Sequence, residues 1–341
     1  MKCVQIVDAK KVELIEREDL IPDKDHVLVK VYSCGICGSD IHYWVSGKPK
    51  ELVMGHEFAG EVVDPGSRKD LKVGDRVTGL PISPCGSCDS CKSGNPQYCK
   101  ETWSKAVGLS VDNPGGYGEY LKCRCDMVRK LPDNIDYDEA AMIEPAAVGL
   151  HAVDLANIKV GENILIIGGG IIGLVSAEFA KMNGAKNIVL LEANEERGKK
   201  SLTYGTVNEY YDVKDESTIP TLMEKYGGFD KVIECCGNSA AVTEAISLCK
   251  PGGKVVLVGV SMEPITIPTV VGVLAEIDLQ GAIAYTEKEF DTCIKLLSEH
   301  TLYLKKYIDR RVPLEEVQES FEVLTSGVDN VIKVIIKPQG E

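Results

Sequence analysis

Residues 163–192 read NILIIGGGIIGLVSAEFAKMNGAKNIVLLE. An apolar run gives way to a cluster of glycines, then to a helical pattern, then to a second apolar run. Gly168, Gly170 and Gly173 have the spacing G-x-G-x-x-G, directly after a predicted strand and at the start of a predicted helix. Glycines in these places let the backbone approach a pyrophosphate at the helix N-terminus. The stretch therefore predicts a β–α–β unit of a doubly wound parallel sheet that binds a dinucleotide.

The residue that closes the second strand indicates which dinucleotide. Glu192 stands where an acidic side chain can accept hydrogen bonds from the ribose hydroxyls of the adenosine. Its charge would repel a 2′-phosphate, which favours NAD over NADP. Arg197 favours NADP instead, because a nearby arginine can accommodate the 2′-phosphate. The sequence favours NAD.

The alternation of apolar runs and helical patterns continues after this unit. Further strands are expected at residues 231–235, 254–260 and 279–285. Ligands of doubly wound sheets bind at the carboxyl ends of the strands. Ile172 in the glycine turn, with Val258 and Val260 at the end of one later strand, are therefore candidate cofactor contacts.

Upstream, a second group of residues has the chemistry of a metal site. The sequence CGICGSDIHYW contains Cys37, and the later sequence GHE contains His56 and Glu57. A thiolate, an imidazole and a carboxylate are ligands that Zn²⁺ prefers, and three protein ligands with an open position are typical of a catalytic zinc. Taken singly, each residue has an ordinary structural reading: a buried thiol, a turn histidine or a surface charge. Their occurrence together favours the metal.

A third group is a run of cysteines. Cys85, Cys88, Cys91 and Cys99 have the spacing C-x2-C-x2-C-x7-C. Short loops bring three thiolates to one point, and the longer excursion returns the fourth. The alternative is a Cys-rich loop without a metal. We expect a structural zinc, closed by four ligands.

These motifs together carry a resemblance. CGICGSDIHYW, GHEFAGEVV and GDRV are similar to sequences of the zinc-dependent medium-chain alcohol and polyol dehydrogenases, in particular the sorbitol dehydrogenase-like branch. The resemblance implies an α/β protein: a GroES-like β-barrel catalytic domain plus a Rossmann coenzyme domain. The expected division is a catalytic domain with the structural zinc over residues 1–148, an NAD-binding domain over 149–285, and a return to the catalytic domain over 286–341.

The resemblance also implies roles for individual residues. Glu144, in EPAAVGLHAV, is expected beside the catalytic zinc as a fourth ligand or the partner of a zinc-bound water; its alternative reading is a carboxylate at a helix N-terminus. Ser39 would take the proton of the alcohol, and His42 would release it. The alternatives are a helix cap for Ser39, an exposed polar residue for His42, and a proton route through a water held by Glu144. Tyr43 and Tyr285 resemble substrate-facing residues. Ala284 replaces the arginine that sorbitol dehydrogenases carry before that second tyrosine, so a different alcohol is expected.

Composition limits the class of partner. The net charge is −14, from 38 basic and 52 acidic residues, and no basic block is present. This argues against nucleic acid or an anionic membrane as a partner. No apolar segment of the sequence resembles a signal peptide or a membrane span. We therefore expect a cytoplasmic protein, and the family likeness implies a homodimer or homotetramer built through the edge strand of the nucleotide domain.

The expected function is transfer of a hydride from a secondary alcohol, such as a polyol, sugar alcohol or diol, to NAD, with two zinc ions per chain. An L-threonine-type amino-alcohol dehydrogenase and a sugar-alcohol-phosphate dehydrogenase are alternatives from the same family. A non-catalytic sensor that binds zinc and NAD is an alternative of another class. Retention of all the candidate catalytic ligands argues against the sensor.

Overall fold

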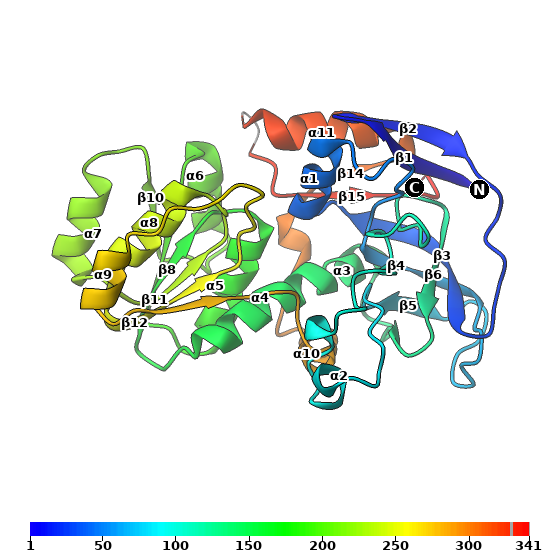
Figure 1. Cartoon of the computed structure of the whole chain (residues 1–341), viewed down its shortest axis with the longest axis horizontal. Coiled ribbons are helices and arrows are strands. Elements are labelled where there is room, and N and C mark those ends of the chain that lie inside the picture. Colours follow the sequence, from blue (N-terminus) through cyan, green and yellow to red (C-terminus); the bar gives the residue numbers. More distant parts are fainter. Residues whose placement is uncertain (328–329, 341) are drawn as a thin grey trace. The chain divides into compact units, whose positions relative to one another are not determined.

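The computed structural model describes residues 1–327 and 330–340. The chain divides into two compact units (Figure 1). Met1–Pro145 together with Thr286–Glu341 forms the first unit, and Ala146–Tyr285 forms the second. The first unit is thus built from both ends of the chain, and the second is one continuous segment.

The second unit contains a six-stranded parallel sheet in the order β10-β9-β8-β11-β12-β13. The strands are β8 (Asn163–Ile167), β9 (Asn187–Glu192), β10 (Glu209–Asp212), β11 (Phe229–Glu234), β12 (Cys249–Leu257) and β13 (Asp278–Gly281). The helices are α5 (Ile171–Met182), α6 (Glu195–Thr203), α7 (Thr218–Tyr226), α8 (Ser239–Leu248) and α9 (Thr269–Leu274), while α4 (Ile143–Ala156) begins in the first unit. In order of appearance the strands lie 3-2-1-4-5-6, which confirms the predicted Rossmann sheet.

The central strands of this sheet share an apolar, buried middle section because both faces of the sheet are covered there. Leu165, Val189, Val232 and Val255 from four neighbouring strands each have 0% exposure. The strand expected at residues 279–285 is shorter in the structure, where β13 ends at Gly281. Ala284 has a φ of 49°, a left-handed conformation that an extended strand does not contain.

The first unit contains a seven-stranded, largely antiparallel sheet in the order β14-β15-β3-β4-β5-β7, with β6 also paired to β3. The strands are β3 (His26–Gly35), β4 (Glu57–Asp64), β5 (Arg76–Gly79), β6 (Tyr120–Arg124), β7 (Val128–Lys130), β14 (Ile308–Val312) and β15 (Lys333–Ile336). A separate hairpin joins β1 (Lys2–Asp8) to β2 (Lys11–Glu16). Strand β3 has three partners because β6 pairs with its first half and β15 with its end.

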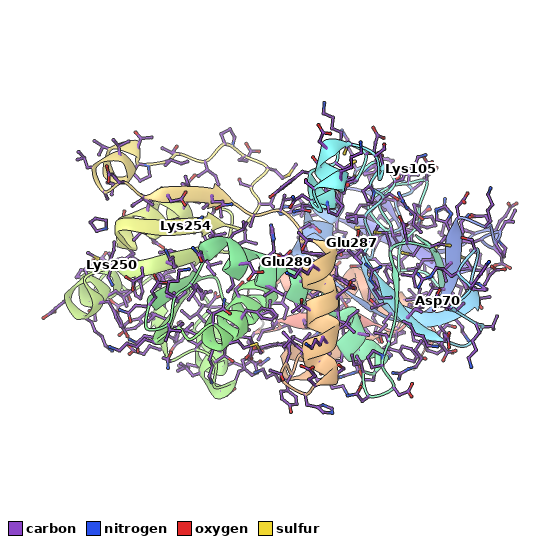
Figure 2. All side chains as sticks on the ribbon, turned by 90° about the horizontal axis from the view of Figure 1, so that it is seen from below. Asp70, Lys105, Lys250, Lys254, Glu287 and Glu289 are labelled. Atoms are coloured by element: carbon purple, nitrogen blue, oxygen red, sulfur yellow. The ribbon has the colours of Figure 1, made fainter. Side chains whose placement is uncertain are left out.

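Helices of the first unit come from both ends of the chain. They are α1 (Gly38–Ser46), α2 (Asp89–Lys92), α3 (Tyr137–Ala141), α10 (Glu287–Ser298) and α11 (Val317–Ser326), with short 3₁₀ turns at Pro96–Tyr98, Lys305–Tyr307 and Leu314–Glu316. Helix α10 carries Glu287 and Glu289 in its first turn (Figure 2). It begins with a capping box, in which the Glu289 carboxylate accepts from the Thr286 backbone N–H at 2.6 Å. Arg129 of β7 pairs with Glu287 at 2.7 Å and fastens this helix to the sheet. Within the described residues, no helix is long and apolar enough to cross a bilayer.

Asp138 connects the two sequence segments of the first unit. Its carboxylate accepts from Ser33 Oγ at 2.6 Å, from Lys337 Nζ at 2.8 Å and from Arg311 Nε at 2.6 Å. Burial would raise the pKa of Asp138, but these three donors, Lys337 first, lower it to about 2. The carboxylate is therefore ionised at neutral pH and joins α3 to β3, β14 and the end of the chain.

The lowered pKa of Asp138 predicts a pH-dependent contribution to stability. A carboxyl group with a depressed pKa stabilises the fold above its unfolded pKa, about 4, and loses this contribution as the pH falls toward 2. We expect Asp138→Asn to lower the free energy of unfolding by about 1–3 kcal/mol at pH 7. The difference from the wild type should shrink between pH 5 and pH 2, as measured by urea unfolding. A difference that is constant with pH would contradict this assignment.

Candidate active site

Three of the predicted zinc ligands lie together in the first unit. Cys37 precedes the first turn of α1, His56 precedes β4, and Glu57 is the first residue of β4. One ligand atom from each side chain lies within 4.8 Å of the others. His56 and Glu57 are buried, and Cys37 is half-buried. The local fold brings them together because β3 and β4 are antiparallel neighbours, with Gly35 opposite Glu57.

Asp40 orients two of these ligands from behind. The Cys37 backbone N–H donates to Asp40 Oδ2 at 3.0 Å, the Tyr117 hydroxyl donates to the same oxygen at 2.7 Å, and Oδ1 lies 3.6 Å from His56 Nδ1. Burial would lower the pKa of His56, but the charges of Asp40, Cys37 and Glu144 raise it well above its ordinary value. At 3.6 Å the Asp40 carboxylate acts on the His56 ring through its charge, without a hydrogen bond between Oδ1 and Nδ1. The environment of His56 therefore fits a metal cation.

Glu57 has a cationic partner, Lys333, from the last strand of the chain. The two side chains form an ion pair, and each has 0% exposure. The Lys333 ammonium also donates to the Ile36 carbonyl at 2.9 Å. Gly35 is required here, because a Cβ at that position would lie 1.9 Å from Glu57 Oε2. Oε1 of Glu57 has no hydrogen-bond partner among the described residues, so this atom is available to a metal ion.

The other residues expected at the catalytic zinc lie around this group. Glu144 is buried in the first turn of α4, and it is outside the set of closest ligand atoms. Its charge nevertheless acts on both His56 and Lys333. On α1, Ser39 is half-buried and His42 is exposed, and their spacing of i and i+3 puts them on one face of the helix.

The two tyrosines expected at the substrate differ in exposure. Tyr43 is half-buried on α1, next to His42. Tyr285 is 1% exposed and among the largest fully buried side chains. In this structure Tyr285 presents almost no surface to a substrate, although its position after Ala284 suggested a contact. The reason is that its ring packs into the protein interior.

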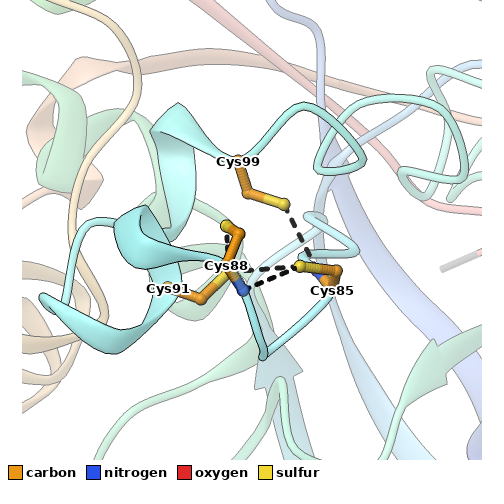
Figure 3. Close-up of side chains that lie close together, drawn as sticks. All are labelled: Cys85, Cys88, Cys91 and Cys99. Carbon is orange, nitrogen blue, oxygen red and sulfur yellow. Dashed lines mark hydrogen bonds between the residues drawn. The ribbon is translucent and has the colours of Figure 1, made fainter.

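The four cysteines of the second cluster lie around one point (Figure 3). Sγ of Cys91 lies 3.5 Å from Sγ of Cys88 and 4.0 Å from Sγ of Cys85. The Cys85 sulfur accepts from the backbone N–H of Cys88 at 3.3 Å, and the Cys99 sulfur accepts from the N–H of Cys85 at 3.4 Å. The Ser87 hydroxyl and the backbone N–H groups of Ser87 and Cys88 lower the pKa of Cys85 to about 6. The donor set fits a four-thiolate zinc site with no open position.

The glycine turn of the second unit forms one side of a cavity of about 450 Å³. Gly168 has a φ of +101°, and a Cβ on Gly173 would lie 2.0 Å from the Gly168 carbonyl oxygen. A Cβ on Gly170 would meet no atom within 4 Å, so the space above this residue is open. The turn thus combines close packing of α5 on β8 with free backbone, which fits a pyrophosphate.

Glu192 and Arg197 line the same cavity as a pair. The Glu192 carboxylate accepts from Arg197 Nη2 at 2.8 Å and Nε at 3.0 Å, from the Gly169 N–H at 2.7 Å and from the Asn194 N–H at 2.8 Å. Burial would raise the pKa of Glu192, but Arg197 and these amides lower it. Ile172 and Val258 are half-buried and Val260 is 58% exposed; none of these three lines this cavity.

Sequence reasoning missed three residues that organise the metal group. They are Asp40, Tyr117 and Lys333, all with 0% exposure. A charge inside an apolar run was the available signal, since Lys333 stands in VIKVII. Asp40 lies between Ser39 and Ile41 in the same motif as Cys37, and an aspartate there gives no local sign that it will be buried. Nothing local indicated that Tyr117 would reach α1.

The fold and the two sets of ligands define a zinc-dependent dehydrogenase with a nicotinamide nucleotide domain. Two family models match the chain: "Alcohol dehydrogenase GroES-like domain" over residues 23–133 and "Zinc-binding dehydrogenase" over residues 172–299. The chain belongs to the zinc-dependent medium-chain dehydrogenases, which confirms the family and the fold class expected from the motifs. It is an oxidoreductase that uses zinc and a nicotinamide cofactor on a small-molecule alcohol.

Relatives within the family act on polyols and diols, according to their names. The sorbitol dehydrogenase of Bombyx mori is 32% identical over 326 residues, 92% of both chains. The D-xylulose reductase of Saccharomyces cerevisiae is 33% identical over 329 residues, 93% of this chain and 92% of that one. The structure of 2R,3R-butanediol dehydrogenase from Bacillus subtilis superposes with a TM-score of 0.87 at 28% identity and covers 99% of both chains.

The four-cysteine group predicts a metal-dependent stability. We expect Cys91→Ser to lose one zinc per chain and to lower the Tm, because a structural zinc stabilises only the folded loop. Metal content by mass spectrometry and Tm by calorimetry measure the two effects. Cys125→Ser is the control, since Cys125 is half-buried and lies outside the group. An unchanged Tm and metal content in Cys91→Ser would exclude a structural zinc.

Proposed function

We propose that this enzyme oxidises, reversibly, a secondary hydroxyl group of a polyol or diol, with NAD as the hydride acceptor. The observation that carries the proposal is the convergence of Cys37, His56 and Glu57 donor atoms within 4.8 Å of one another. When bound there, Zn²⁺ supplies a Lewis acid that lowers the pKa of a substrate hydroxyl. The second unit supplies the glycine turn and Glu192 for the cofactor.

In this proposal Cys37 and His56 hold the metal, and Asp40 orients both. The third protein ligand is Glu57 or Glu144. The two alternatives differ in the contacts that each carboxylate already makes. Glu57 is already paired with Lys333, whereas Glu144 is buried in the first turn of α4. Lys333 pairs with Oε2 of Glu57, and Oε1 has no hydrogen-bond partner among the described residues. Oε1 is therefore the Glu57 atom that could bind the metal.

The proton of the alcohol needs a route to solvent. Ser39 is half-buried and His42 is exposed on the same face of α1, immediately after Cys37. We assign Ser39 to receiving the proton and His42 to releasing it. The gradient of exposure along this face supports that direction.

The choice of alcohol follows from what the chain lacks. Sorbitol dehydrogenases carry an arginine where this chain has Ala284. A long polyol would therefore lack the hydrogen bonds that such an arginine donates to its distal hydroxyls. Short diols and shorter polyols are therefore the preferred substrates in this proposal. A screen of polyols, diols, sugar-alcohol phosphates and threonine, followed by NADH absorbance, separates this proposal from its alternatives within the family.

We place the enzyme in the cytoplasm, where cysteine thiols stay reduced and available to zinc.

The metal assignment predicts the effect of removing one ligand. Cys37→Ser should lower kcat/KM by roughly a thousandfold or more, because a site that has lost a ligand no longer holds the metal that acidifies the substrate hydroxyl. A thousandfold loss corresponds to about 4 kcal/mol of transition-state stabilisation. NADH binding, followed by fluorescence, should stay close to the wild-type value because the nucleotide turn belongs to the other unit. The same Cys125→Ser variant serves as the control. Full activity in Cys37→Ser would remove the metal assignment.

The Glu192–Arg197 pair predicts the effect of removing the carboxylate. Glu192→Ser should shift the ratio of kcat/KM for NADP to that for NAD by roughly tenfold to a hundredfold. The physical reason is that a repelling charge is lost and Arg197 is released from its bidentate pair. Adding Arg197→Ala to this variant should remove most of the gain. If Glu192→Ser keeps the wild-type preference, the ribose contact is wrong.

We also propose that two copies of the chain associate through the β13 edge of the six-stranded sheet in the second unit. Strand β13 pairs only with β12 among the described strands. Exposed apolar side chains occur on α9, the helix that precedes β13 in the chain, where Val270, Val273 and Leu274 are 67%, 73% and 82% exposed. An unpaired edge flanked by apolar surface is the usual setting for strand pairing between copies.

The proposed association predicts that a charge on α9 will separate the copies. Leu274→Glu should move the sedimentation coefficient to that of a monomer, because two like charges would face each other across the interface. Val160→Glu is the matched control, since Val160 is 86% exposed and lies outside this patch. A wild-type chain that sediments as a monomer would end this part of the proposal.

A further inference from the structure

Glu244 is an acidic side chain that lines the nucleotide cavity and that none of the assignments above explains. It lies on α8, and Ala240, Ala241 and Glu244 all line the cavity that also contains Glu192 and Arg197. The spacing of i, i+1 and i+4 puts these three residues on one face of the helix. Glu244 is half-buried, so its carboxylate lies in the wall of the cavity rather than on the open surface.

This carboxylate lacks the partners that the other acidic group in the cavity has. Glu192 accepts four hydrogen bonds, two of them from Arg197. In the described part of the chain, no donor lies within hydrogen-bond or ion-pair distance of the Glu244 carboxylate. Burial raises the pKa of Glu244, with no compensating neighbour. Its oxygens are not among the fully buried atoms that lack a partner, so solvent reaches them. No donor of the described residues occupies this acceptor, and a ligand that brings a donor into the cavity can pair with it.

The remaining lining of the cavity indicates which part of a ligand reaches Glu244. The ribose end is marked by Glu192 and the pyrophosphate end by Gly170. Ala193, Val213 and Ala240 supply small apolar surfaces, which suit the flat faces of a base. Adenine has a single exocyclic donor, its 6-amino group, whereas hypoxanthine and guanine carry a carbonyl oxygen at that position.

We propose that Glu244 is a specificity-determining residue that recognises the adenine base by accepting a hydrogen bond from its 6-amino group. The inference rests on the proposed function, because it requires that the cavity binds NAD. It goes beyond that function in assigning base selection to one side chain. A carboxylate rejects a 6-carbonyl base in two ways, through the lost donor and through repulsion between two oxygen acceptors.

The test compares dissociation constants for NADH and for its deamino analogue, in which hypoxanthine replaces adenine. The zinc-loaded full-length enzyme is titrated with each, and binding is followed by fluorescence or calorimetry rather than by turnover. The wild type should bind NADH roughly tenfold or more tightly, which corresponds to about 1.4 kcal/mol. Glu244→Ala should reduce this preference to about one.

Glu244→Gln gives an independent and opposite signature. The glutamine amide keeps an oxygen that can accept from adenine and adds an N–H that can donate to hypoxanthine. This variant should therefore bind the deamino analogue more tightly than the wild type does. Glu224→Ala, which removes an exposed carboxylate of α7 outside the cavity, should leave the preference unchanged.

The outcomes separate this inference from the function on which it rests. An unchanged preference in Glu244→Ala, or equal weakening of both ligands, would overturn the recognition of the base while leaving NAD binding intact. A wild-type enzyme that binds neither ligand would overturn the proposed function itself. Equal affinity of the wild type for both ligands would also reject Glu244 as a selective residue.

Discussion

The buried ion pair between Glu57 and Lys333 is the constraint that holds the metal site together. Two charged groups with no exposure are costly to bury, and they are tolerated only when each is paired and hydrogen-bonded. Lys333 meets this condition with the carboxylate and with the carbonyl of Ile36, the residue before Cys37. One ammonium group thus fixes the positions of β3, β4 and β15. The spacing between the thiol and the acidic side chain follows from it.

The two metal-ligand groups differ in how they are assembled. Cys85, Cys88, Cys91 and Cys99 come from a single loop, and backbone N–H groups of that loop already stabilise their sulfurs. The group of Cys37, His56 and Glu57 instead depends on α1, β4 and a strand from the end of the chain. A closed local group suits a structural ion. An open group held by distant elements suits an ion that must also meet a substrate.

Sequence reasoning succeeded where the signal was local. The glycine turn at Gly168 and the four cysteines are defined by spacing alone, and the structure places both sets as that spacing requires. It failed where partners are far apart in the chain. Lys333 lies 276 residues from Glu57, and no local pattern connects them. The contact of Tyr285 with the substrate stays a prediction, and its 1% exposure results from tertiary packing that its motif position does not show.

The discontinuity of the first unit has a consequence for how the enzyme is made. Domains fold largely in the order in which the ribosome delivers them. The segment from Ala146 to Tyr285 is complete before the last strands of the other unit exist. Until Lys333 leaves the ribosome, Glu57 has no cation beside it, and β3 lacks a neighbour along its final residues. A nascent chain can therefore acquire its nucleotide site while its metal site is still unformed, and premature termination would release a protein of that kind.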